Sequence, residues 1–251
     1  MAPSVLILAG TTEATALARA VADRGLNGTV SFAGRVTRPL RQPLPQRVGG
    51  FGGAEGLAAY LREAGISHIV DATHPFAVQM SRNAVAASAA TGVPLVALTR
   101  PAWRAQAGDR WQCVPDIAGA VAALDRPRTH VMLAVGRMHL AAFAPHQQHR
   151  YLLRLVDPPA IPLPLLETKI VVDRGPFDAA SDRRLMEDHG IELVVSKNSG
   201  GTGAYAKIAA ARALDLPVVM IDRPMLPERH ALHDVAEVLD WIVHTGTALG
   251  V

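Results

Sequence analysis

Short runs of apolar residues recur along the chain, and most are followed by a segment in which apolar residues return at helical spacing. The runs predict β-strands at residues 4–9, 29–33, 68–71, 94–98, 130–135, 151–156, 169–172, 192–196 and 217–221. The spaced segments predict helices at residues 13–24, 54–63, 77–90, 117–124, 177–189, 203–214 and 234–244. Short apolar strands that alternate with helices are typical of a parallel sheet covered on both faces. The sequence therefore predicts an α/β fold.

The alternation of strands and helices breaks near residues 99–104 and then starts again. A chain of 251 residues is long enough for two domains of this kind. We therefore expect two doubly wound Rossmann-like domains with parallel sheets, at residues 1–99 and 100–251, and a ligand cleft between them. Residues 37–53 and the proline-rich residues 157–166 have no regular pattern and are expected to be surface loops.

Hydrophobic residues make up 49% of the chain, yet the pattern does not predict a membrane span. The longest apolar stretch, residues 84–98, is interrupted by Ser88, Gly92 and Pro94 and is too short to cross a bilayer. No signal peptide is expected, because the first residues lack a basic flank. Cys113 is the only cysteine, which excludes an internal disulfide and a multi-cysteine metal site. A reducing cytoplasm is the expected location.

The net charge of +3 is carried almost wholly by arginine, since Lys169, Lys197 and Lys207 are the only lysines. Arginine binds carboxylates and phosphates through two parallel hydrogen bonds, so the excess favours an anionic ligand. Nucleic acid is a weaker interpretation, because the arginines are scattered and aromatic residues make up 4% of the chain. A genome rich in G and C would produce the same arginine excess, and this alternative stays open.

The first predicted strand ends at Gly10, and Thr11, Thr12 and Glu13 lead into the first predicted helix. In a Rossmann unit this turn binds the pyrophosphate of a dinucleotide through backbone N–H groups and the positive end of the helix dipole. The full G-x-G-x-x-G fingerprint is missing, but the threonine hydroxyls can donate to phosphate. The alternative is a simple helix cap, with Thr12 as N-cap and Glu13 in the first turn.

The second predicted strand runs into Gly34 and Arg35, with Arg38 just beyond and no acidic residue nearby. An acidic residue at this position binds the ribose 2′-hydroxyl of NAD, whereas arginine suits the 2′-phosphate of NADP. If a dinucleotide binds, the sequence favours NADP(H).

The third predicted strand, residues 68–71, is followed by Thr73, His74 and Pro75. This is the edge at which a parallel sheet faces its ligand. His74 is a candidate to hydrogen-bond a cofactor or to donate a proton. The alternative is a turn residue that precedes proline, and both interpretations stay open.

In the second half, a strand, a glycine-rich loop and a helix follow one another in the order expected for an anion cradle. The loop contributes Lys197, Asn198, Ser199, Gly200 and Gly201. It is not a P-loop, because its lysine precedes the glycines. The alternative is a tight turn that requires glycine for its backbone angles.

Two further features belong to the candidate site, and one glycine-rich segment is set aside. Gly136 and Arg137 form a smaller version of the same arrangement, and Arg100 lies at the junction of the halves, where it could line the cleft. The glycine-rich residues 49–56 follow a proline-containing segment that cannot be a central strand, so a mobile loop is expected there. Metal-binding, hydrolase and short-chain dehydrogenase motifs are missing from the sequence.

Together these segments resemble the precorrin-6A reductase family of cobalamin (vitamin B12) biosynthesis. The matching motifs are LILAGTTEA at 6–14, DATHPFA at 71–77, RPAW at 100–103, VGR at 135–137, RGPF at 174–177, KNSGGTG at 197–203, PVVM at 217–220 and RP at 223–224. They span most of the chain in the family's order. Ala9 departs from the family's pattern, which commonly has a second glycine there.

The resemblance implies that NADPH reduces one carbon–carbon double bond of a corrin precursor, giving precorrin-6B. By position, residues 10–13 would hold the pyrophosphate, Gly34 and Arg35 would lie near the 2′-phosphate, and residues 73–75 would approach the ribose or nicotinamide. The polycarboxylate macrocycle would face Arg100, Arg137 and residues 197–201. No metal, nucleic acid or membrane is implied, and a monomer is compatible with the sequence.

Two alternatives remain at this point. A cobalt-containing substrate, as in the anaerobic route, would be reduced by the same chemistry. A non-redox nucleotide-binding or glycosyltransferase-like protein could be built from the same two α/β halves. The proton donor is not identified, and water and His74 are equal candidates.

Overall fold

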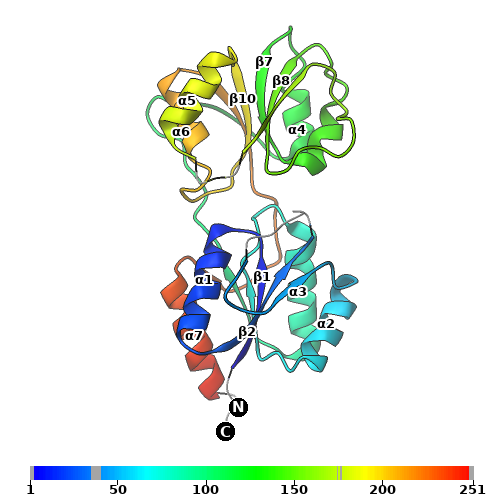
Figure 1. Cartoon of the computed structure of the whole chain (residues 1–251), viewed down its shortest axis with the longest axis vertical. Helices are drawn as coiled ribbons and strands as arrows, with labels where there is room; N and C mark the ends of the chain where they lie inside the picture. The colour runs from blue at the N-terminus through cyan, green and yellow to red at the C-terminus, as the bar shows by residue number, and fades with distance from the viewer. Residues whose placement is uncertain (1–2, 35–40, 174, 176, 249–251) are drawn as a thin grey trace. The chain divides into compact units, whose positions relative to one another are not determined.

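The structure, a computed structural model, describes residues 3–34, 41–173, 175 and 177–248. The chain forms two compact units (Figure 1). The first unit combines Met1–Arg100 with Met225–Val251, and the second is Pro101–Pro224. The first boundary lies within two residues of the expected one, but the last residues differ from the expectation. The sequence predicts these residues in the second domain, whereas the structure returns them to the first unit.

The sheet of the first unit has six strands, and every pair is parallel. The strands are β1 (Ser4–Ala9), β2 (Asn27–Phe32), β3 (Gln46–Val48), β4 (His68–Asp71), β5 (Leu95–Leu98) and β12 (Ala231–Leu232). Their spatial order, β3-β2-β1-β4-β5-β12, is the order of dinucleotide-binding Rossmann sheets. The chain changes direction across the sheet between β1 and β4, and ligands of such sheets bind at the carboxyl ends of these two strands.

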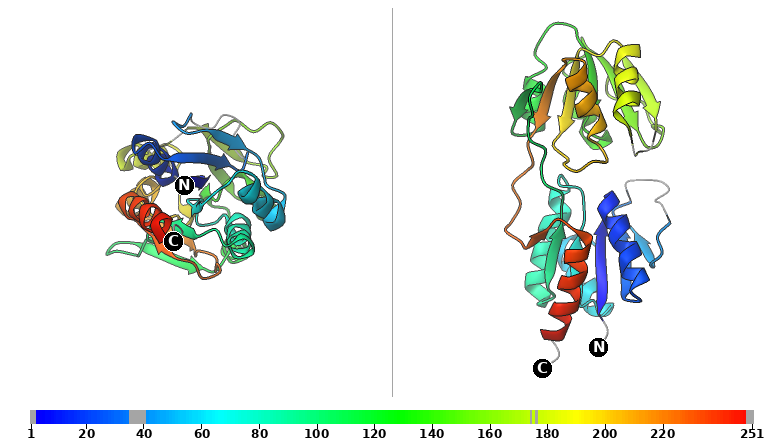
Figure 2. Two further views of the ribbon diagram at one scale, coloured as in Figure 1. Left: turned by 90° about the horizontal axis from the view of Figure 1, so that it is seen from below. Right: turned by 90° about the vertical axis from the view of Figure 1, so that its left-hand side faces the viewer.

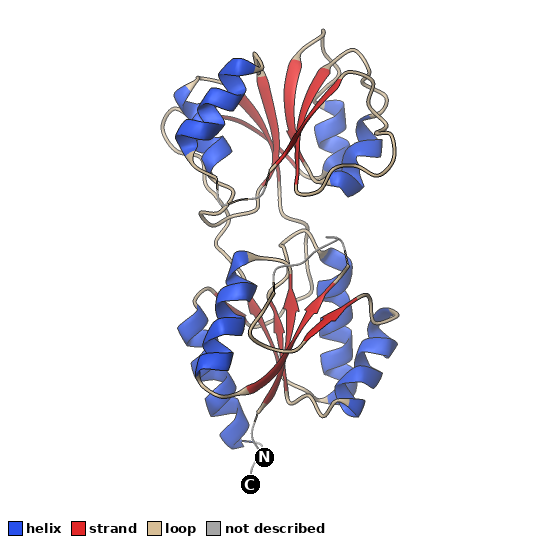
Figure 3. Cartoon of the chain, viewed as in Figure 1, coloured by secondary structure: helices blue, strands red, loops and turns tan. Residues whose placement is uncertain are grey.

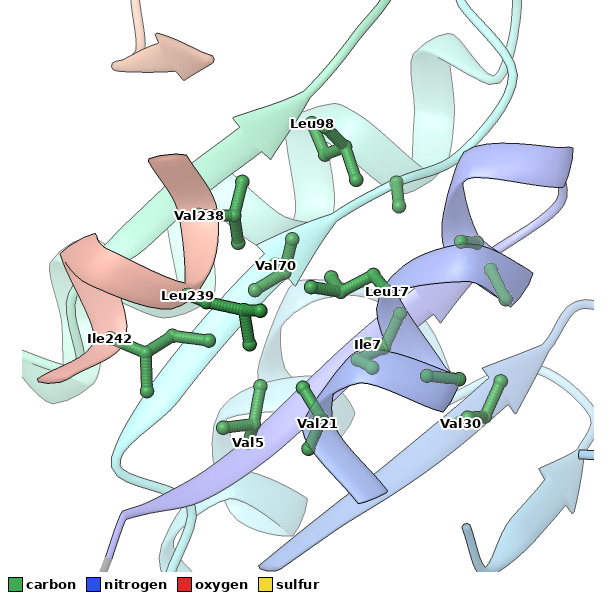
Figure 4. Packing of buried hydrophobic residues seen from close by; sticks show 14 of the residues in the cluster. Val5, Ile7, Leu17, Val21, Val30, Val70, Leu98, Val238, Leu239 and Ile242 are labelled. Atoms are coloured by element: carbon green, nitrogen blue, oxygen red, sulfur yellow. The ribbon is translucent and has the colours of Figure 1, made fainter. Parts of the chain in front are cut away.

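Helices cover both faces of this sheet, as the apolar strands require (Figure 3). The helices are α1 (Thr12–Asp23), α2 (Gly53–Glu63), α3 (Val78–Thr91) and α7 (Val235–Ala248). Val5 and Ile7 of β1 pack with α1 and α7, where Leu17 and Val238 are buried (Figure 4). Leu6 and Leu8 point to the opposite face, against α2 and α3. The alternation of side chains along a strand therefore divides one apolar run between two cores.

The C-terminal helix completes the first of these cores. Helix α7 packs against α1, and the two ribbons lie side by side in Figures 1 and 2. Val238 and Ile242 are fully buried there. The preceding strand β12 pairs with β5 through Ala231 and Leu232. Because the last residues supply both a strand and a covering helix, the first unit is incomplete without them.

The second unit also has a parallel six-stranded sheet. Its strands are β6 (Arg110–Val114), β7 (His130–Ala134), β8 (Arg150–Leu155), β9 (Thr168–Val172), β10 (Leu193–Lys197) and β11 (Pro217–Ile221). Their spatial order is β9-β8-β7-β10-β11-β6. Counted from β7, this repeats the order of the first sheet. The two sheets differ in the origin of the sixth strand. In the second unit this strand, β6, precedes the other five in the sequence, whereas in the first unit β12 follows the other five.

The helices of the second unit are α4 (Ile117–Ala122), the 3₁₀ helix η1 (Arg137–Phe143), α5 (Ala179–Asp188) and α6 (Ala206–Ala213). Helices α5 and α6 pack against each other and bury Met186 and Ile208 in a core with Met132 of β7. Helices α4 and η1 also contact each other. A short 3₁₀ helix thus follows β7, where the first unit has a regular α-helix after β1.

The nine predicted strands are confirmed, with ends that shift by at most two residues, and all seven predicted helices are present. Three strands and η1 were not expected. Strand β3 lies within the expected loop 37–53, β6 carries polar residues at an edge of its sheet, and β12 is very short. Each lacks the continuous apolar run of a central strand. In the described part of the chain, no helix has the length and apolar character that a membrane crossing requires.

Candidate functional site

The turn after β1 lies beside the turn after β4 at the carboxyl edge of the first sheet. A Cβ added to Gly10 would lie 3.6 Å from the backbone nitrogen of His74 and 3.9 Å from Cα of Thr73. These are ordinary contacts, so neither crowding nor backbone conformation requires glycine here. Gly10 is exposed at the position where the backbone of a Rossmann turn approaches a pyrophosphate.

Thr11 is the N-cap of α1, one residue before the position considered in the sequence. Its side-chain oxygen accepts a hydrogen bond of 3.2 Å from the Ala14 amide. Its hydroxyl donates to the carbonyl of Ala72, at 2.9 Å, and so ties the β1 turn to the β4 turn. Both capacities of the hydroxyl are therefore used within the protein. An anion at this turn would be met by backbone N–H groups of the first turn, which have no acceptor within a helix.

Thr12, Glu13 and Arg100 form a small polar cluster over the first turn of α1. The Thr12 hydroxyl donates to Oε2 of Glu13 at 3.0 Å, and Nη1 of Arg100 lies 3.1 Å from the same oxygen. The Arg100 side chain is 11% exposed. Arg100 was assigned to the substrate from its place at the junction. The structure puts it in the first unit, beside the predicted cofactor turn, where it compensates the charge of Glu13.

Asp71, the last residue of β4, is buried and organises the turn that follows. Its Oδ1 accepts hydrogen bonds from the Thr73 amide, at 3.2 Å, and from the Thr73 hydroxyl, at 2.6 Å. Its Oδ2 accepts from the Ser81 hydroxyl at 2.7 Å and forms an ion pair with Nη1 of Arg229 at 3.1 Å. Asp71 is 2% exposed. The conformation of Thr73 is thus fixed by a carboxylate that the sequence interpretation did not assign to the site.

His74 and Pro75 continue this turn. Nδ1 of His74 accepts a hydrogen bond of 3.2 Å from the Phe76 amide, which requires a lone pair on that nitrogen. The neutral ring therefore carries its proton on Nε2. His74 is half-buried and Pro75 is buried. The hydrogen bond from Phe76 agrees with a turn residue, and it leaves Nε2 as the ring nitrogen that a ligand role would use; whether His74 donates a proton stays a prediction.

The end of β2 is described only in part. Gly34 is exposed and has a φ of 75°, a left-handed conformation that favours glycine. Arg35 and Arg38 lie outside the described residues. The described residues at this strand end, 32–34, include no carboxylate, and the preference for NADP over NAD stays a prediction.

In the second unit, the amide side chain of Asn198 is bound to the backbone of Trp103. The Trp103 amide donates to Oδ1 of Asn198 at 2.8 Å, and Nδ2 of Asn198 donates to the Trp103 carbonyl at 2.9 Å. The indole nitrogen of Trp103 donates to the carbonyl of Gly201 at 2.7 Å. Asn198 is 8% exposed. Its side chain therefore holds two loops of the unit together, in contrast to the substrate role expected from the sequence.

Gly200 and Gly201 have φ values of 68° and 66°, so the loop after β10 requires glycine for its conformation. A Cβ on Gly200 would also lie 2.2 Å from Nη2 of Arg223 and 2.3 Å from the Pro101 carbonyl. Arg223 donates to the carbonyl of Ser199 at 3.1 Å. The backbone angles therefore agree with the alternative given above, a tight turn that requires glycine. Lys197 ends β10 half-buried, and its contact with substrate stays a prediction.

Arg137 opens η1, directly after Gly136, at the carboxyl end of β7. Its Nη2 donates to the carbonyls of Asp157, at 2.7 Å, and Pro158, at 3.2 Å. The side chain thus anchors the start of the expected loop 157–166 and remains on an exposed surface. The structure places Arg137 and Lys197 on neighbouring strand ends, because β7 pairs with β10.

Sequence reasoning missed two members of the first site, Ser81 and Arg229, and assigned no role to Asp71. A carboxylate at the end of an apolar strand was a visible signal, since a buried charge needs a partner. The identity of that partner was not visible, because Arg229 follows the whole second unit in the sequence. Among the described residues, no three His, Cys, Asp or Glu side chains gather in a way that could hold a metal ion.

The geometry of the first unit fits a dinucleotide. Its sheet has the appropriate strand order, the β1 turn is open at Gly10, and α1 begins directly after this turn. The comparable turn of the second unit begins a 3₁₀ helix at Arg137. The neighbouring strand β10 ends in a loop in which the side chains of Asn198 and Arg223 bind backbone groups. The first unit is therefore the better candidate for a nucleotide site.

Known proteins match the chain over almost its whole length. The family model for the precorrin-6x reductase CbiJ/CobK matches residues 4–243. A precorrin-6A reductase of Rhodobacter capsulatus is 53% identical over 248 residues, which cover 98% of this chain and 99% of that protein. A cobalt-precorrin-6A reductase of Priestia megaterium is 29% identical over 252 residues, covering 96% of this chain and 98% of that protein.

The fold is likewise matched by a solved structure. The CobK precorrin-6A reductase superposes with a TM-score of 0.94 at 53% identity, and the match covers 97% of both chains. A match of this coverage includes residues of both units.

Proposed function

This chain belongs to the precorrin-6x reductase CbiJ/CobK family, and from that premise we propose that it reduces precorrin-6A to precorrin-6B with NADPH. One observation carries the proposal: the 53% identity to a precorrin-6A reductase spans nearly all of both chains. The matched stretch covers the turn at residues 10–13 and the loop at residues 197–203, which carry two of the sequence motifs. The alternative of a non-redox nucleotide-binding protein is not favoured by any relative named above.

In this proposal the first unit holds the cofactor. The backbone N–H groups of Thr12 and Glu13 bind the pyrophosphate, and Gly10 keeps the turn open for its approach. When bound, the nicotinamide supplies the hydride that reduces the double bond. Thr73, His74 and Pro75 face the ribose or nicotinamide from the adjacent turn. The protein's main task is then to hold two ligands in a reactive geometry, which can lower a barrier by up to about 7–11 kcal/mol.

We propose NADPH rather than NADH as the reductant. The support is the strand end at residues 32–34, which offers no carboxylate for a ribose 2′-hydroxyl, together with Arg35 in the sequence. Substituting Arg35→Glu should weaken NADPH binding far more than NADH binding, as measured by fluorescence titration. Equal losses for the two cofactors would remove the 2′-phosphate assignment.

The proton that accompanies the hydride comes from His74 or from water. The hydrogen bond from the Phe76 amide occupies Nδ1 of His74, so Nε2 is the ring nitrogen that would pass a proton to the substrate. If His74 is the donor, His74→Ala slows turnover while NADPH affinity changes little. Unchanged turnover in this variant would leave water as the donor.

The substrate is proposed to be the metal-free macrocycle. The relative named as a precorrin-6A reductase is 53% identical, and the one named as a cobalt-precorrin-6A reductase is 29% identical. Arg137 and Lys197, at neighbouring strand ends of the second unit, are the cations proposed to bind acetate and propionate groups of the substrate.

The decisive experiment mixes the purified chain with NADPH and precorrin-6A and follows the absorbance of the reduced nicotinamide. The proposal predicts oxidation of NADPH that depends on both enzyme and substrate. A parallel reaction with the cobalt-loaded macrocycle should be slower. Faster turnover of the cobalt form would favour the anaerobic substrate, and no oxidation with either macrocycle would contradict the proposed reaction.

A further inference from the structure

A buried ion pair connects the end of β4 to the returning C-terminal segment. The side chain of Asp71 is 1% exposed and that of Arg229 is 13% exposed, with Nη1 and Oδ2 separated by 3.1 Å. An ionised carboxylate at this depth is costly unless it is paired and hydrogen-bonded. Arg229 supplies the compensating charge, although it lies in the segment that follows the second unit.

The other contacts of Asp71 lead directly to the predicted cofactor turn. Its Oδ1 accepts from both the amide and the hydroxyl of Thr73, so two atoms of Thr73 are fixed to one carboxylate oxygen. Its Oδ2 is shared between Arg229 and the Ser81 hydroxyl, at the start of α3. The orientation of the carboxylate, and with it the path of the chain from Thr73 into His74, therefore depends on contacts at both oxygens.

We propose that Arg229 is a positioning residue for the cofactor: its ion pair holds the Asp71 carboxylate in the orientation that keeps the Thr73–His74 turn beside Gly10. This inference rests on the proposed function for the identity of the ligand. Arg229 acts through Asp71 and Thr73 and need not contact the cofactor. Without the guanidinium, the buried carboxylate loses the charged partner of its Oδ2 and turns toward solvent, and Oδ1 loses its role as a double acceptor.

The contact that Thr73 makes with Asp71 gives a readout that does not require the cofactor. The substitution Arg229→Met should speed hydrogen exchange at the Thr73 amide in the free protein, because this amide loses Oδ1 of Asp71 as its acceptor. The same variant should bind NADPH about ten-fold more weakly, as expected when one well-placed hydrogen bond is lost. Arg229→Lys keeps the charge and should recover affinity to within about three-fold of the unaltered protein.

Two controls separate positioning from general loss of stability. Leu239→Ala opens a cavity in the core of the same unit and should lower the melting temperature without changing Thr73 exchange or NADPH affinity. Arg24→Met removes an exposed ion pair with Asp240, at 3.7 Å, and should change none of the three measurements. If Arg229→Met does not fold, Arg229→Lys and Ser81→Ala take its place. Arg229→Lys alters the ion pair at Oδ2 of Asp71 but keeps a positive charge there. Ser81→Ala removes the hydroxyl contact of the same oxygen and leaves Arg229 in place.

The outcomes distinguish the two proposals. Failure of the unaltered protein to bind NADPH would contradict the proposed function, while the exchange measurement would still test the contact between Arg229, Asp71 and Thr73. Unchanged Thr73 exchange and unchanged NADPH affinity in the folded Arg229 variants would overturn the positioning role. So would a loss of affinity in Leu239→Ala equal to that in Arg229→Met, because stability alone would then explain the effect.

Discussion

The two units share one strand order but use the carboxyl ends of their central strands differently. In the first unit, β1 leads through an exposed Gly10 into a regular helix. In the second, β7 leads through Gly136 into a 3₁₀ helix, and the loop after neighbouring β10 is filled by contacts of Asn198 and Arg223. Equal topology therefore does not give equal sites, because the local contacts of the turns decide whether a ligand can approach the backbone.

The two units also differ in how their glycines are used. Gly10 has ordinary space around its absent side chain, whereas Gly200 is required by both its backbone angle and its neighbours. The fold does not require glycine at position 10, so a ligand can account for it there, whereas the fold itself accounts for Gly200. The predictions that follow test this contrast.

The largest effect is expected for Gly200→Ala. The new Cβ would lie 2.2 Å from Nη2 of Arg223 in a residue whose φ is 68°. Overpacking and the left-handed conformation together should cost roughly 2–5 kcal/mol in the free energy of unfolding. Urea unfolding checks this value. A loss below about 1 kcal/mol would mean that the loop after β10 relaxes freely and is not the rigid element described here.

A pH effect of similar size is expected for Tyr151 in the second unit. Burial raises the pKa of Tyr151 to about 12 from its usual value of 10, and its hydroxyl donates to the carbonyl of His146. The stabilisation is complete below pH 10 and is lost as the pH rises toward 12, because only the unfolded chain releases the proton in that window. The full loss is about 2.7 kcal/mol. Tyr151→Phe should lack this alkaline dependence in urea titrations.

The first unit should respond to pH in the opposite direction, through His68. Burial lowers the pKa of His68 below 6.5, and the ring lies edge-on to Trp241 at 5.3 Å. Its contribution is therefore present above pH 6.5 and is lost as the pH falls below that value. Trp241 fluorescence reports this unit. The same acid response in His68→Asn would show that other groups cause it.

A smaller effect, mainly a loss of ligand affinity, is expected for Gly10→Ala. The free energy of unfolding should stay the same or rise by about 0.4–1 kcal/mol, because alanine restricts the unfolded chain and fits the site. NADPH affinity should fall about ten-fold, since the methyl group stands where the pyrophosphate would approach. Calorimetry and fluorescence titration measure the two quantities. Unchanged affinity would contradict a cofactor site at this turn.

The smallest effects are expected for Arg100 and Arg137, the two arginines that the sequence assigned to the substrate. Their substitutions should affect different ligands. Arg100→Met leaves Glu13 uncompensated beside the cofactor turn and should weaken NADPH binding about three- to five-fold. Arg137→Met lies in the second unit and should raise the KM for precorrin-6A by a similar factor without affecting NADPH. Steady-state kinetics with each ligand varied in turn distinguishes the two. Effects of both variants on the same KM would remove the separation of roles between the units.

The sequence alone determined the elements and the chemistry class of this protein. Continuous apolar runs such as Val5–Leu8 are typical of central strands of a covered parallel sheet, and the motifs around Gly10 and Lys197 indicated the family. Polar edge strands such as β6 were missed, because an edge strand is half-exposed and carries no such run. Arg35 and Arg38 remain assigned by sequence only.

The tertiary structure decided which polar groups are left for ligands. Asn198 and the Thr11 hydroxyl looked available in the sequence, yet each is bound to backbone groups that are distant along the chain. Arg229 looked unremarkable, yet it compensates a carboxylate at the predicted cofactor turn. Hydrophobic periodicity is a local property and can be read from neighbours, whereas hydrogen-bond and charge partners are set by which distant segments the fold brings together.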